Sequence, residues 1–236
     1  MKALLLAGGY GTRLLPITKA TPKCLVDING EKLLDIWLAK LLESGINEII
    51  INTHHLDDVV NQHINQSIYK NNVRLVYEDK LLGTAGTIKK NKVFFGNGPL
   101  IVVHADNLSI FNMDEFKNCF MERPPGIHIT MMTFNTDCPE LCGIVELDKN
   151  GVVIKFYEKI SNPPGNLANG AVYIIDVDVL EFISAIDGDI IDFSTKIIPS
   201  FIGKINTFHN KFYHRDIGTP ESLKTARIDY ASMVKN

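Results

Sequence analysis

The start of the chain constrains its fold most strongly, because an apolar segment there ends in a glycine-rich turn followed by two cations. The sequence reads LLLAGGYGTRLLP from Leu4 to Pro16, and Lys23 comes shortly after. Glycine has no Cβ, so the backbone can approach a ligand closely and direct several N–H groups at one anion. Arg13 can fork onto phosphate oxygens, and Lys23 adds a compact second charge. This segment predicts a strand followed by a loop that suits a nucleoside triphosphate.

Two common glycine-rich motifs do not fit this turn. A P-loop needs Gly, four residues and then Gly-Lys-Ser/Thr, which the segment lacks. The dinucleotide fingerprint needs Gly-x-Gly-x-x-Gly, and Leu14 takes the third glycine position after Gly9 and Gly11. A tight turn after a first strand is the alternative to a binding loop. The added Thr12-Arg13 and Pro22-Lys23 favour the binding loop.

Length and composition are those of an ordinary globular protein. The chain has 236 residues, enough for a substantial core in one large domain. Its net charge of −3 argues against a nucleic-acid partner held by bulk electrostatics. No apolar stretch approaches the ~20 residues that span a bilayer, so we expect no membrane partner. The four cysteines show no paired pattern, which predicts a cytoplasmic protein.

The first half alternates between strand-like and helix-like segments. This rhythm predicts an α/β fold with a Rossmann-like, mostly parallel mixed sheet and helices on both faces. Ligands of such sheets bind at the carboxyl ends of the strands, so the glycine turn and Asp106 should share one edge. We expect strands at 3–7, 48–52, 73–77 and 100–103, and helices at 33–42, 56–65, 84–90 and 113–121.

The second half is richer in strands. Asp148-Lys149-Asn150-Gly151 predicts a hairpin turn, and Thr219 with Pro220 predicts the start of the last helix. Pro124-Pro125-Gly126 marks a weak seam, which we interpret as a subdomain boundary inside a single domain of residues 1–236. We expect strands at 127–134, 143–147, 152–157, 171–175, 205–208 and 212–216, and a helix at 177–186.

A second glycine-containing turn runs from Glu78 to Thr87 and leads into the predicted helix at 84–90. Its N–H groups and the Thr84 hydroxyl could read a base edge or hold a phosphate at the helix N-terminus. A simple helix start explains the same residues equally well.

Asp106 and Asp216 are the candidate metal ligands, because each lies at the predicted end of a strand. Magnesium favours a few carboxylates together with phosphate oxygens and waters. A cap or turn role is the alternative for either residue. A transition-metal site of His104, His54 and His55 would require these histidines to lie close together.

A further polar group suits a sugar phosphate, which needs carboxylates and amides for its hydroxyls and a cation for its phosphate. Surface polarity near turns is the alternative. The residues are Gly143, Glu158, Lys159, Asn169 and Gly170.

Residues 4–23 resemble the signature of nucleotidyltransferases that join a nucleoside triphosphate to a sugar 1-phosphate. That signature reads roughly Leu-Ala-Gly-Gly-x-Gly-Thr-Arg-Leu, then a Pro-x-Thr step and Pro-Lys. Five separated motifs follow the family order from residue 1 to about residue 225. The resemblance implies a glycosyltransferase-A-like fold with a small β-rich sugar-binding subdomain. Residues 1–123 would mainly bind the nucleotide and residues 124–236 mainly the sugar phosphate.

The resemblance also implies site residues and Mg²⁺. It places Arg13 and Lys23 in catalysis and Asp106 and Asp216 on the metal. It assigns the nucleotide to Leu6, Ala7, Gly8, Gly9, Gly11, Thr12, Glu78, Gly83, Thr84 and Ala85, and the sugar phosphate to Gly143, Glu158, Lys159, Asn169 and Gly170.

Two departures from the family pattern bear on these assignments. Many members have Asn-Gly where this chain has His104-Ala105, directly before Asp106. The family often has proline after Glu-Lys, where this chain has Ile160. The second departure leaves the sugar preference open.

The implied reaction gives a nucleotide-sugar and pyrophosphate. It would serve nucleotide-sugar and polysaccharide biosynthesis. The loop from Leu82 to Gly86 is most similar to that of mannose-1-phosphate guanylyltransferases, which favours GTP and a mannose-type sugar. Heptose, glucosamine or N-acetylmuramic acid 1-phosphates, and UTP, CTP or dTTP, remain open. Two other functions also remain open: that of a phosphocholine-type cytidylyltransferase and that of a non-catalytic nucleotide-sugar sensor. A homodimer is possible.

Overall fold

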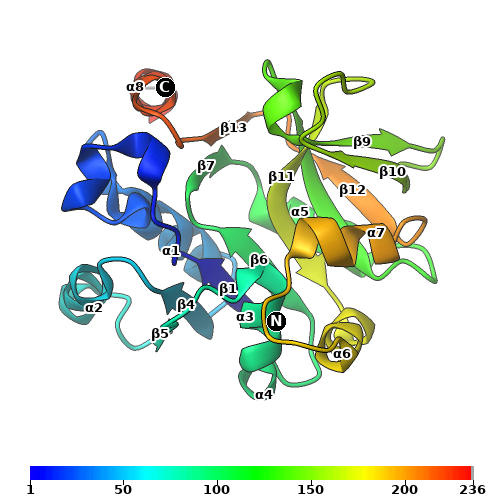
Figure 1. Ribbon diagram of the computed structural model, residues 1–236, viewed down its shortest axis with the longest axis horizontal. Coiled ribbons are helices and arrows are strands. Elements are labelled where there is room, and N and C mark those ends of the chain that lie inside the picture. Colours follow the sequence, from blue (N-terminus) through cyan, green and yellow to red (C-terminus); the bar gives the residue numbers. More distant parts are fainter. Residues whose placement is uncertain (235–236) are drawn as a thin grey trace. The chain divides into compact units, whose positions relative to one another are not determined.

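The structure, a computed structural model, describes residues 1–234, which form two compact units (Figure 1). The glycine-loop unit comprises residues 3–81, 104–110 and 213–234. The hairpin unit comprises residues 1–2, 82–103 and 111–212. Each unit therefore draws on segments that are distant in the sequence. No helix within residues 1–234 is both long and apolar enough to cross a membrane.

Three parallel strands form the centre of the glycine-loop unit. They are β1 (Lys2–Leu6), β4 (Ile49–Thr53) and β5 (Val73–Tyr77), and β4 pairs with both of the others. Helices α1 (Leu33–Glu43) and α2 (Asp57–Gln66) provide the crossovers between these strands, as Figure 1 shows. The helices form because apolar side chains recur at helical spacing. In α1 the buried residues are Leu33, Leu34, Trp37, Leu38 and Leu41.

Two shorter ribbons complete this unit. Strand β7 (Asn107–Ile110) pairs antiparallel with β13 (Tyr213–Asp216), and β2 (Asp27–Ile28) pairs with β3 (Glu31–Lys32). Helix α8 (Pro220–Val234) follows β13, and Thr219 Oγ1 accepts a hydrogen bond from the Ser222 N–H at 3.2 Å. The predicted cap at Thr219 is therefore present.

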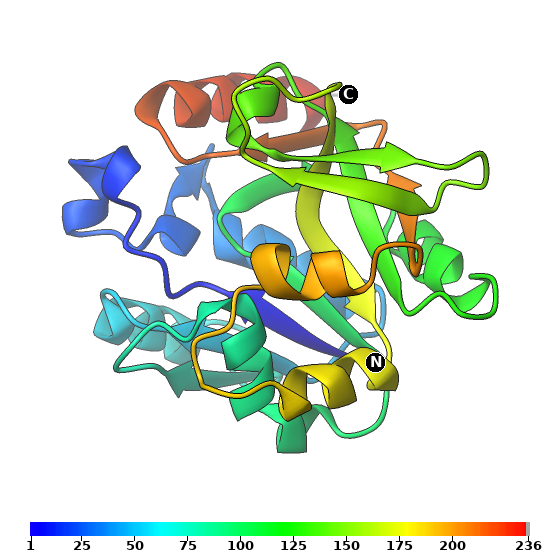
Figure 2. The same ribbon diagram turned by 45° about the vertical axis from the view of Figure 1, so that its right-hand side comes forward.

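Antiparallel pairing dominates the hairpin unit. The pairs are β6 with β11, β11 with β8 and β9, and β9 with β10, while β12 and β8 run parallel. Figure 2 shows the β9–β10 hairpin as two adjacent green strands. Gly151 closes its turn at φ +78°, a left-handed conformation that glycine adopts readily. The strand bounds are β6 (Leu100–His104), β8 (Ile129–Asn135), β9 (Gly143–Leu147), β10 (Val153–Glu158), β11 (Leu167–Ile175) and β12 (Ile205–His209).

Side-chain caps fix the starts of two helices in this unit. Asn112 Oδ1 accepts the N–H groups of Asp114 and Glu115, and Asp176 Oδ1 accepts those of Asp178 and Val179. Both caps satisfy N–H groups that have no partner inside the helix. The helices are α3 (Gly83–Lys90), α4 (Lys92–Phe95), α5 (Met113–Met121), α6 (Val177–Ala185) and α7 (Ile198–Ser200).

The predicted α/β class with a mixed sheet and helices is confirmed. Several features were not predicted from the sequence, among them the short strands β2, β3 and β7, helix α4, the helical segment from 193 to 200, and the first half of β11. The polar Asn169-Gly170 pair is typical of a turn, yet it lies inside β11 where the pairing with β8 shifts register. Pairing with a distant strand outweighs the local turn preference there.

Candidate active site

The glycine loop is fixed at its start by β4 and by the chain after β6. The Ala7 N–H donates to Asn52 Oδ1 at 2.9 Å, and the Leu6 carbonyl accepts the Ala105 N–H at 3.1 Å. A Cβ on Gly8 would lie 3.1 Å from Asn52 Nδ2. Asn52 is buried at the end of β4 and is a loop-holding residue that sequence reasoning missed. Its polar side chain at the end of an apolar strand is the signal that could have revealed it.

The end of the loop requires glycine. Gly11 has φ +62°, and a Cβ there would lie only 2.8 Å from Thr18 Cγ2. The Thr18 hydroxyl donates to the Gly11 carbonyl at 2.8 Å. The chain then enters a 3-10 turn over Thr12–Leu14, in which Leu14 is buried and Arg13 is largely exposed. The loop is thus shaped by contacts that no larger residue would allow.

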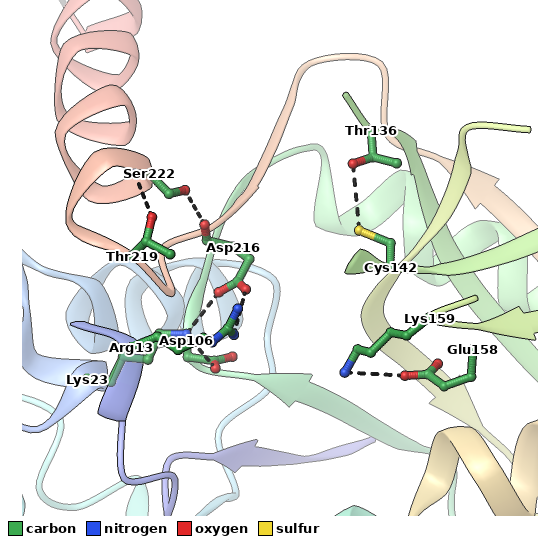
Figure 3. Close-up of polar contacts among 10 residues, drawn as sticks. All are labelled: Arg13, Lys23, Asp106, Thr136, Cys142, Glu158, Lys159, Asp216, Thr219 and Ser222. Carbon is green, nitrogen blue, oxygen red and sulfur yellow. Dashed lines mark hydrogen bonds and ion pairs between the residues drawn. The ribbon is translucent and has the colours of Figure 1, made fainter. Parts of the chain in front are cut away.

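Lys23 links the two candidate metal ligands (Figure 3). Its Nζ lies 2.8 Å from Asp106 Oδ2 and 2.9 Å from Asp216 Oδ1. The Lys23 side chain is only 8% exposed, whereas those of Asp106 and Asp216 are 40% and 51% exposed. Arg13 Nη2 lies 3.4 Å from Asp216 Oδ2. Two cations and two carboxylates therefore form one cluster in the glycine-loop unit.

The β7–β13 ribbon brings the two aspartates together. Asp216 is the last residue of β13 and is paired with Asn107, the residue after Asp106. The Ile217 N–H donates to the Asp106 carbonyl at 3.4 Å. Gly218 follows, and a Cβ there would lie 2.9 Å from Arg13 Nη2. Glycine at this position leaves room for the guanidinium beside Asp216.

The contacts between Lys23 and Asp106 favour the charged form of both of these groups. Burial alone would lower the pKa of Lys23, but the charges of Asp106 and Asp216 and their hydrogen bonds raise it. Burial likewise opposes ionisation of Asp106, but Lys23 and His104 outweigh it and lower the pKa of that carboxyl. Burial lowers the pKa of the neighbouring His214 to about 3, so this imidazole is neutral near pH 7.

The donor set of this cluster fits a hard divalent cation. Asp106 and Asp216 offer carboxylate oxygens, the ligand type that Mg²⁺ prefers, and both side chains are partly exposed. Within residues 1–234 no metal-type cluster joins His104 to His54 and His55, so the transition-metal alternative has no support.

One other group of possible metal ligands, in the hairpin unit, is explained by its internal contacts. His128 Nδ1 lies 3.0 Å from Asp176 Oδ2 and 3.2 Å from Asp178 Oδ2. Asp176 also pairs with Arg123 at 3.2 Å and caps α6. The arginine and the positive end of the helix already compensate the carboxylate.

The second glycine turn contacts another segment of its own unit. The Ala85 and Gly86 N–H groups both donate to the Ile191 carbonyl, at 3.0 and 3.1 Å. A Cβ on Gly83 would lie 2.6 Å from the Ile191 oxygen, and one on Gly86 would lie 2.2 Å from the Asp189 oxygen. The sequence made N–H groups of this turn candidates for contact with a ligand. The N–H groups of Ala85 and Gly86 instead donate to the protein backbone. Both glycines are needed for this close backbone packing.

The hairpin holds three of the residues expected to bind a sugar phosphate. Glu158 faces Gly143 in the β9–β10 register, and a Cβ on Gly143 would lie 2.5 Å from Phe156 Cζ. Lys159 has φ +49°, unusual for a residue with a side chain, and its N–H donates to the Cys142 carbonyl at 3.1 Å. Its Nζ lies 3.4 Å from Glu158 Oε1. Figure 3 draws this ion pair as a dashed line.

The other two expected sugar residues form the irregular part of β11. The Ala171 N–H donates to Asn169 Oδ1 at 3.0 Å, and Asn169 Nδ2 donates to the Tyr173 hydroxyl at 2.6 Å. Ala171 has φ +53°, so the backbone around Gly170 leaves the regular strand conformation. Tyr173 is buried and was missed from the sequence, where it resembles any core aromatic residue.

The predicted site residues thus fall into two sets, one in each unit. The glycine-loop unit holds Leu6, Ala7, Gly8, Gly9, Gly11, Thr12, Arg13, Lys23, Glu78, Asp106 and Asp216. The hairpin unit holds Gly83, Thr84, Ala85, Gly143, Glu158, Lys159, Asn169 and Gly170.

Several curated proteins are similar to this chain. The mannose-1-phosphate guanylyltransferase catalytic subunit beta of Xenopus tropicalis is 26% identical over 242 residues, covering 100% of this chain and 66% of that protein. Mannose-1-phosphate guanyltransferase 2 of Candida glabrata is 26% identical over 231 residues, covering 94% of this chain and 63% of that protein. The chain therefore spans less than two thirds of the length of these relatives.

Solved structures share its fold. A provisionally assigned glucose-1-phosphate thymidylyltransferase from Bacillus anthracis, in complex with sucrose, has a TM-score of 0.84 at 25% identity, covering 97% of this chain and 94% of that chain. HddC from Yersinia pseudotuberculosis, complexed with GMP-PN, has a TM-score of 0.80 at 25% identity, covering 97% and 99%. The model of the nucleotidyl transferase family matches residues 2–233, and this chain belongs to that family.

Proposed function

We propose that the protein transfers a nucleotidyl group from a nucleoside triphosphate to a sugar 1-phosphate, releasing pyrophosphate. The observation that carries this proposal is the buried Lys23 ammonium between Asp106 and Asp216, next to Arg13 and the glycine loop. Such a cluster suits a polyphosphate, because it combines fixed cations with carboxylates that can share a divalent ion. Family membership supports the same reaction class.

In the proposed reaction a phosphate oxygen of the sugar 1-phosphate attacks the α-phosphorus. A new P–O bond forms, the bond to the bridging α–β oxygen breaks, and pyrophosphate leaves with that electron pair. The attacking phosphate is already ionised near pH 7, so no protein base is needed. The chain's contribution is to position the two substrates and offset their charge.

We assign Arg13 and the loop residues 6–12 to the triphosphate and Lys23 to the reacting phosphates. The loop is already shaped by Asn52 and Thr18, so its N–H groups need little rearrangement to meet an anion. Lys23 stays protonated in its acidic surroundings and so brings a permanent positive charge. These assignments agree with the chemistry of the side chains.

Asp106 and Asp216 would hold Mg²⁺. When bound, this ion offsets negative charge on the phosphates during transfer. Lys23 orients both carboxylates through contacts of 2.8 and 2.9 Å.

We assign the acceptor to the hairpin unit and the base to the second glycine turn. Glu158, Lys159 and Asn169 offer a carboxylate, a cation and an amide to a sugar phosphate, with Gly143 and Gly170 shaping the backbone. Glu78, Gly83, Thr84 and Ala85 are assigned to the base. Because the Ala85 N–H is bonded to Ile191, we expect any reading of the base there to use other groups of this turn.

We favour GTP and a mannose-type 1-phosphate, in a cytoplasmic pathway of nucleotide-sugar synthesis. The guanylyltransferase relatives and the GMP-PN bound to HddC support this choice. The similarity to a provisional thymidylyltransferase supports dTTP as a second candidate.

A matrix of nucleoside triphosphates against sugar 1-phosphates, followed by pyrophosphate release with Mg²⁺, tests the proposal. We expect one combination to dominate and its rate to depend on both substrates. For substitutions of Lys23, the matched control is Lys32→Ala. Lys32 lies in the same unit and forms an exposed 3.7 Å ion pair with Asp27. Pyrophosphate release with phosphocholine, but with no sugar 1-phosphate, would refute the proposal. Binding of nucleotide-sugar without turnover would instead identify a sensor.

A further inference from the structure

An aromatic cluster lies next to the glycine loop within the same unit. Tyr10 belongs to the loop, His54 follows β4, and Tyr77 is the last residue of β5. The rings of Tyr10 and His54 have centroids 5.0 Å apart and meet edge to face, while His54 stacks on Tyr77 at 6.4 Å. Tyr10 is 51% exposed and Tyr77 is 55% exposed. The cluster therefore presents aromatic surface beside the loop.

Both ring nitrogens of His54 have hydrogen-bond partners. Nδ1 lies 2.6 Å from the Glu78 carbonyl oxygen, and Nε2 lies 2.7 Å from the Tyr10 hydroxyl oxygen. A carbonyl can only accept, so Nδ1 carries the proton and Nε2 of the neutral ring accepts from the Tyr10 hydroxyl. The Glu78 N–H in turn donates to the Thr53 carbonyl at 2.9 Å. These contacts tie the Tyr10 ring to β4 and β5.

The backbone around Tyr10 would by itself leave the Tyr10 ring free to move. Tyr10 lies between Gly9, whose Cβ direction is open, and Gly11, whose backbone is left-handed. A half-exposed ring on such a backbone would lose considerable freedom when it is fixed in one orientation. The His54 hydrogen bond and the tilted contact with His55, at 5.7 Å between centroids, fix it nonetheless. The fold thus orients an aromatic face that packing does not require.

We propose that Tyr10 contacts the nucleoside part of the triphosphate, and that His54 is a positioning residue that fixes the Tyr10 ring for this contact. The inference rests on the proposed function, which brings a nucleoside triphosphate to this loop. Every base has a π-face, so an aromatic ring stacks on any of them. Tyr10 accordingly adds affinity for the nucleoside without selecting the base.

Tyr10 could contact the nucleoside, or it could only shape the loop that binds the phosphates. Inorganic tripolyphosphate distinguishes these two roles, because it has the phosphates and lacks the nucleoside. Binding of GTP, UTP, CTP, dTTP and tripolyphosphate to the full chain is measured by calorimetry without sugar 1-phosphate. We expect Tyr10→Ala to weaken binding of all four nucleotides by about 5- to 100-fold. Tripolyphosphate binding should change less than about twofold, since it makes no stacking contact.

Two further variants isolate the hydrogen bond. Tyr10→Phe keeps the ring and removes the hydroxyl, and His54→Phe removes the acceptor. Each should weaken nucleotide binding less than Tyr10→Ala and leave tripolyphosphate binding unchanged. Tyr230→Phe is the matched control, because it removes a hydroxyl that donates to Glu31 at 2.9 Å elsewhere in the same unit. It should bind all ligands like the unmodified protein.

Several outcomes would overturn the inference. An equal loss of nucleotide and tripolyphosphate binding in Tyr10→Ala would mean that Tyr10 only shapes the loop. Unchanged nucleotide binding, or no nucleotide binding by the unmodified protein, would also refute it. If Tyr10→Ala unfolds, Tyr10→Leu provides the same comparison with more of the apolar volume retained. Because no acceptor is present, a protein that binds nucleotides through Tyr10 but transfers nothing would refute the proposed function alone.

Discussion

Lys23 and Asp216 lie 193 residues apart in the sequence, and Lys23 Nζ is 2.9 Å from Asp216 Oδ1. Asp106 makes a second contact with the same ammonium at 2.8 Å. The buried ammonium and the two carboxylates hold one another in place, so the cluster is arranged for a charged substrate before one arrives.

Lys23→Ala should reduce kcat/KM for nucleotidyl transfer by about 100- to 1,000-fold, the usual cost of losing one fixed charge-stabilising donor. The fold should remain, because the surrounding turn is held by Cys24 and Leu25, which are buried. Pyrophosphate release gives the rate, and circular dichroism reports the fold. Lys32→Ala serves as the control. A folded Lys23→Ala protein with a near-normal rate would remove Lys23 from the reaction.

Asp216→Asn should shift the Mg²⁺ dependence of the rate to at least about tenfold higher concentration, because one anionic ligand is lost. The rate is measured against Mg²⁺ concentration at saturating substrates. Asp114→Asn, an exposed carboxylate on α5 in the hairpin unit, should leave the curve in place. An unchanged Mg²⁺ curve in Asp216→Asn would show that this carboxylate does not hold the metal.

Gly11→Ala and Gly9→Ala should differ sharply in stability. A side chain at Gly11 must adopt φ +62° and would approach Thr18 to 2.8 Å, whereas Gly9 has open space around its Cβ direction. We expect Gly11→Ala to lower the free energy of unfolding by about 1–2 kcal/mol and Gly9→Ala to change it little. Urea denaturation measures both. Equal effects would mean that the loop is not held in this conformation in solution.

Gly86→Ala should also destabilise the protein, because its Cβ would lie 2.2 Å from the Asp189 carbonyl oxygen. Backbone must move to make room, and such overpacking costs about 1–3 kcal/mol. Gly98→Ala is the control within the hairpin unit, since nothing lies near its Cβ direction. Thermal unfolding compares the two variants, and an unaffected Gly86→Ala protein would contradict the packing of Ile191 and Asp189 on α3.

The hairpin turn should lose stability in acid. N–H groups of Val152 and Asn150 donate to Asp148 and lower the pKa of this exposed carboxyl below its ordinary 3.8. A depressed pKa means that the ionised form favours the folded state above the ordinary pKa, and that this contribution disappears as the pH falls through the folded-state pKa. The stability difference between the unmodified protein and Asp148→Asn should therefore shrink between pH 6 and pH 2. Urea denaturation at both pH values measures it, and a constant difference would contradict the prediction.

The sequence alone predicted the class of fold and most elements, since these depend on local patterns. Strands Val73–Tyr77 and Gly143–Leu147 have the predicted bounds, and the predicted cap at Thr219 is present. Positions 4–23 also carried the family resemblance that the match over residues 2–233 confirms. The functions of the individual site residues remain predictions.

Only the tertiary structure decided which distant groups meet. The sequence predicted that Asp106 and the glycine loop share one edge of the sheet. The contacts of Lys23 with Asp106 and Asp216 depend on the pairing of β13 with β7, and β7 was not predicted. Two other long-range contacts also appear only in the tertiary structure. The Ile191 carbonyl accepts hydrogen bonds from N–H groups of α3, and the Tyr173 hydroxyl orients Asn169. Pairing between remote segments depends on how whole surfaces fit together, and the residues next to each segment do not encode it.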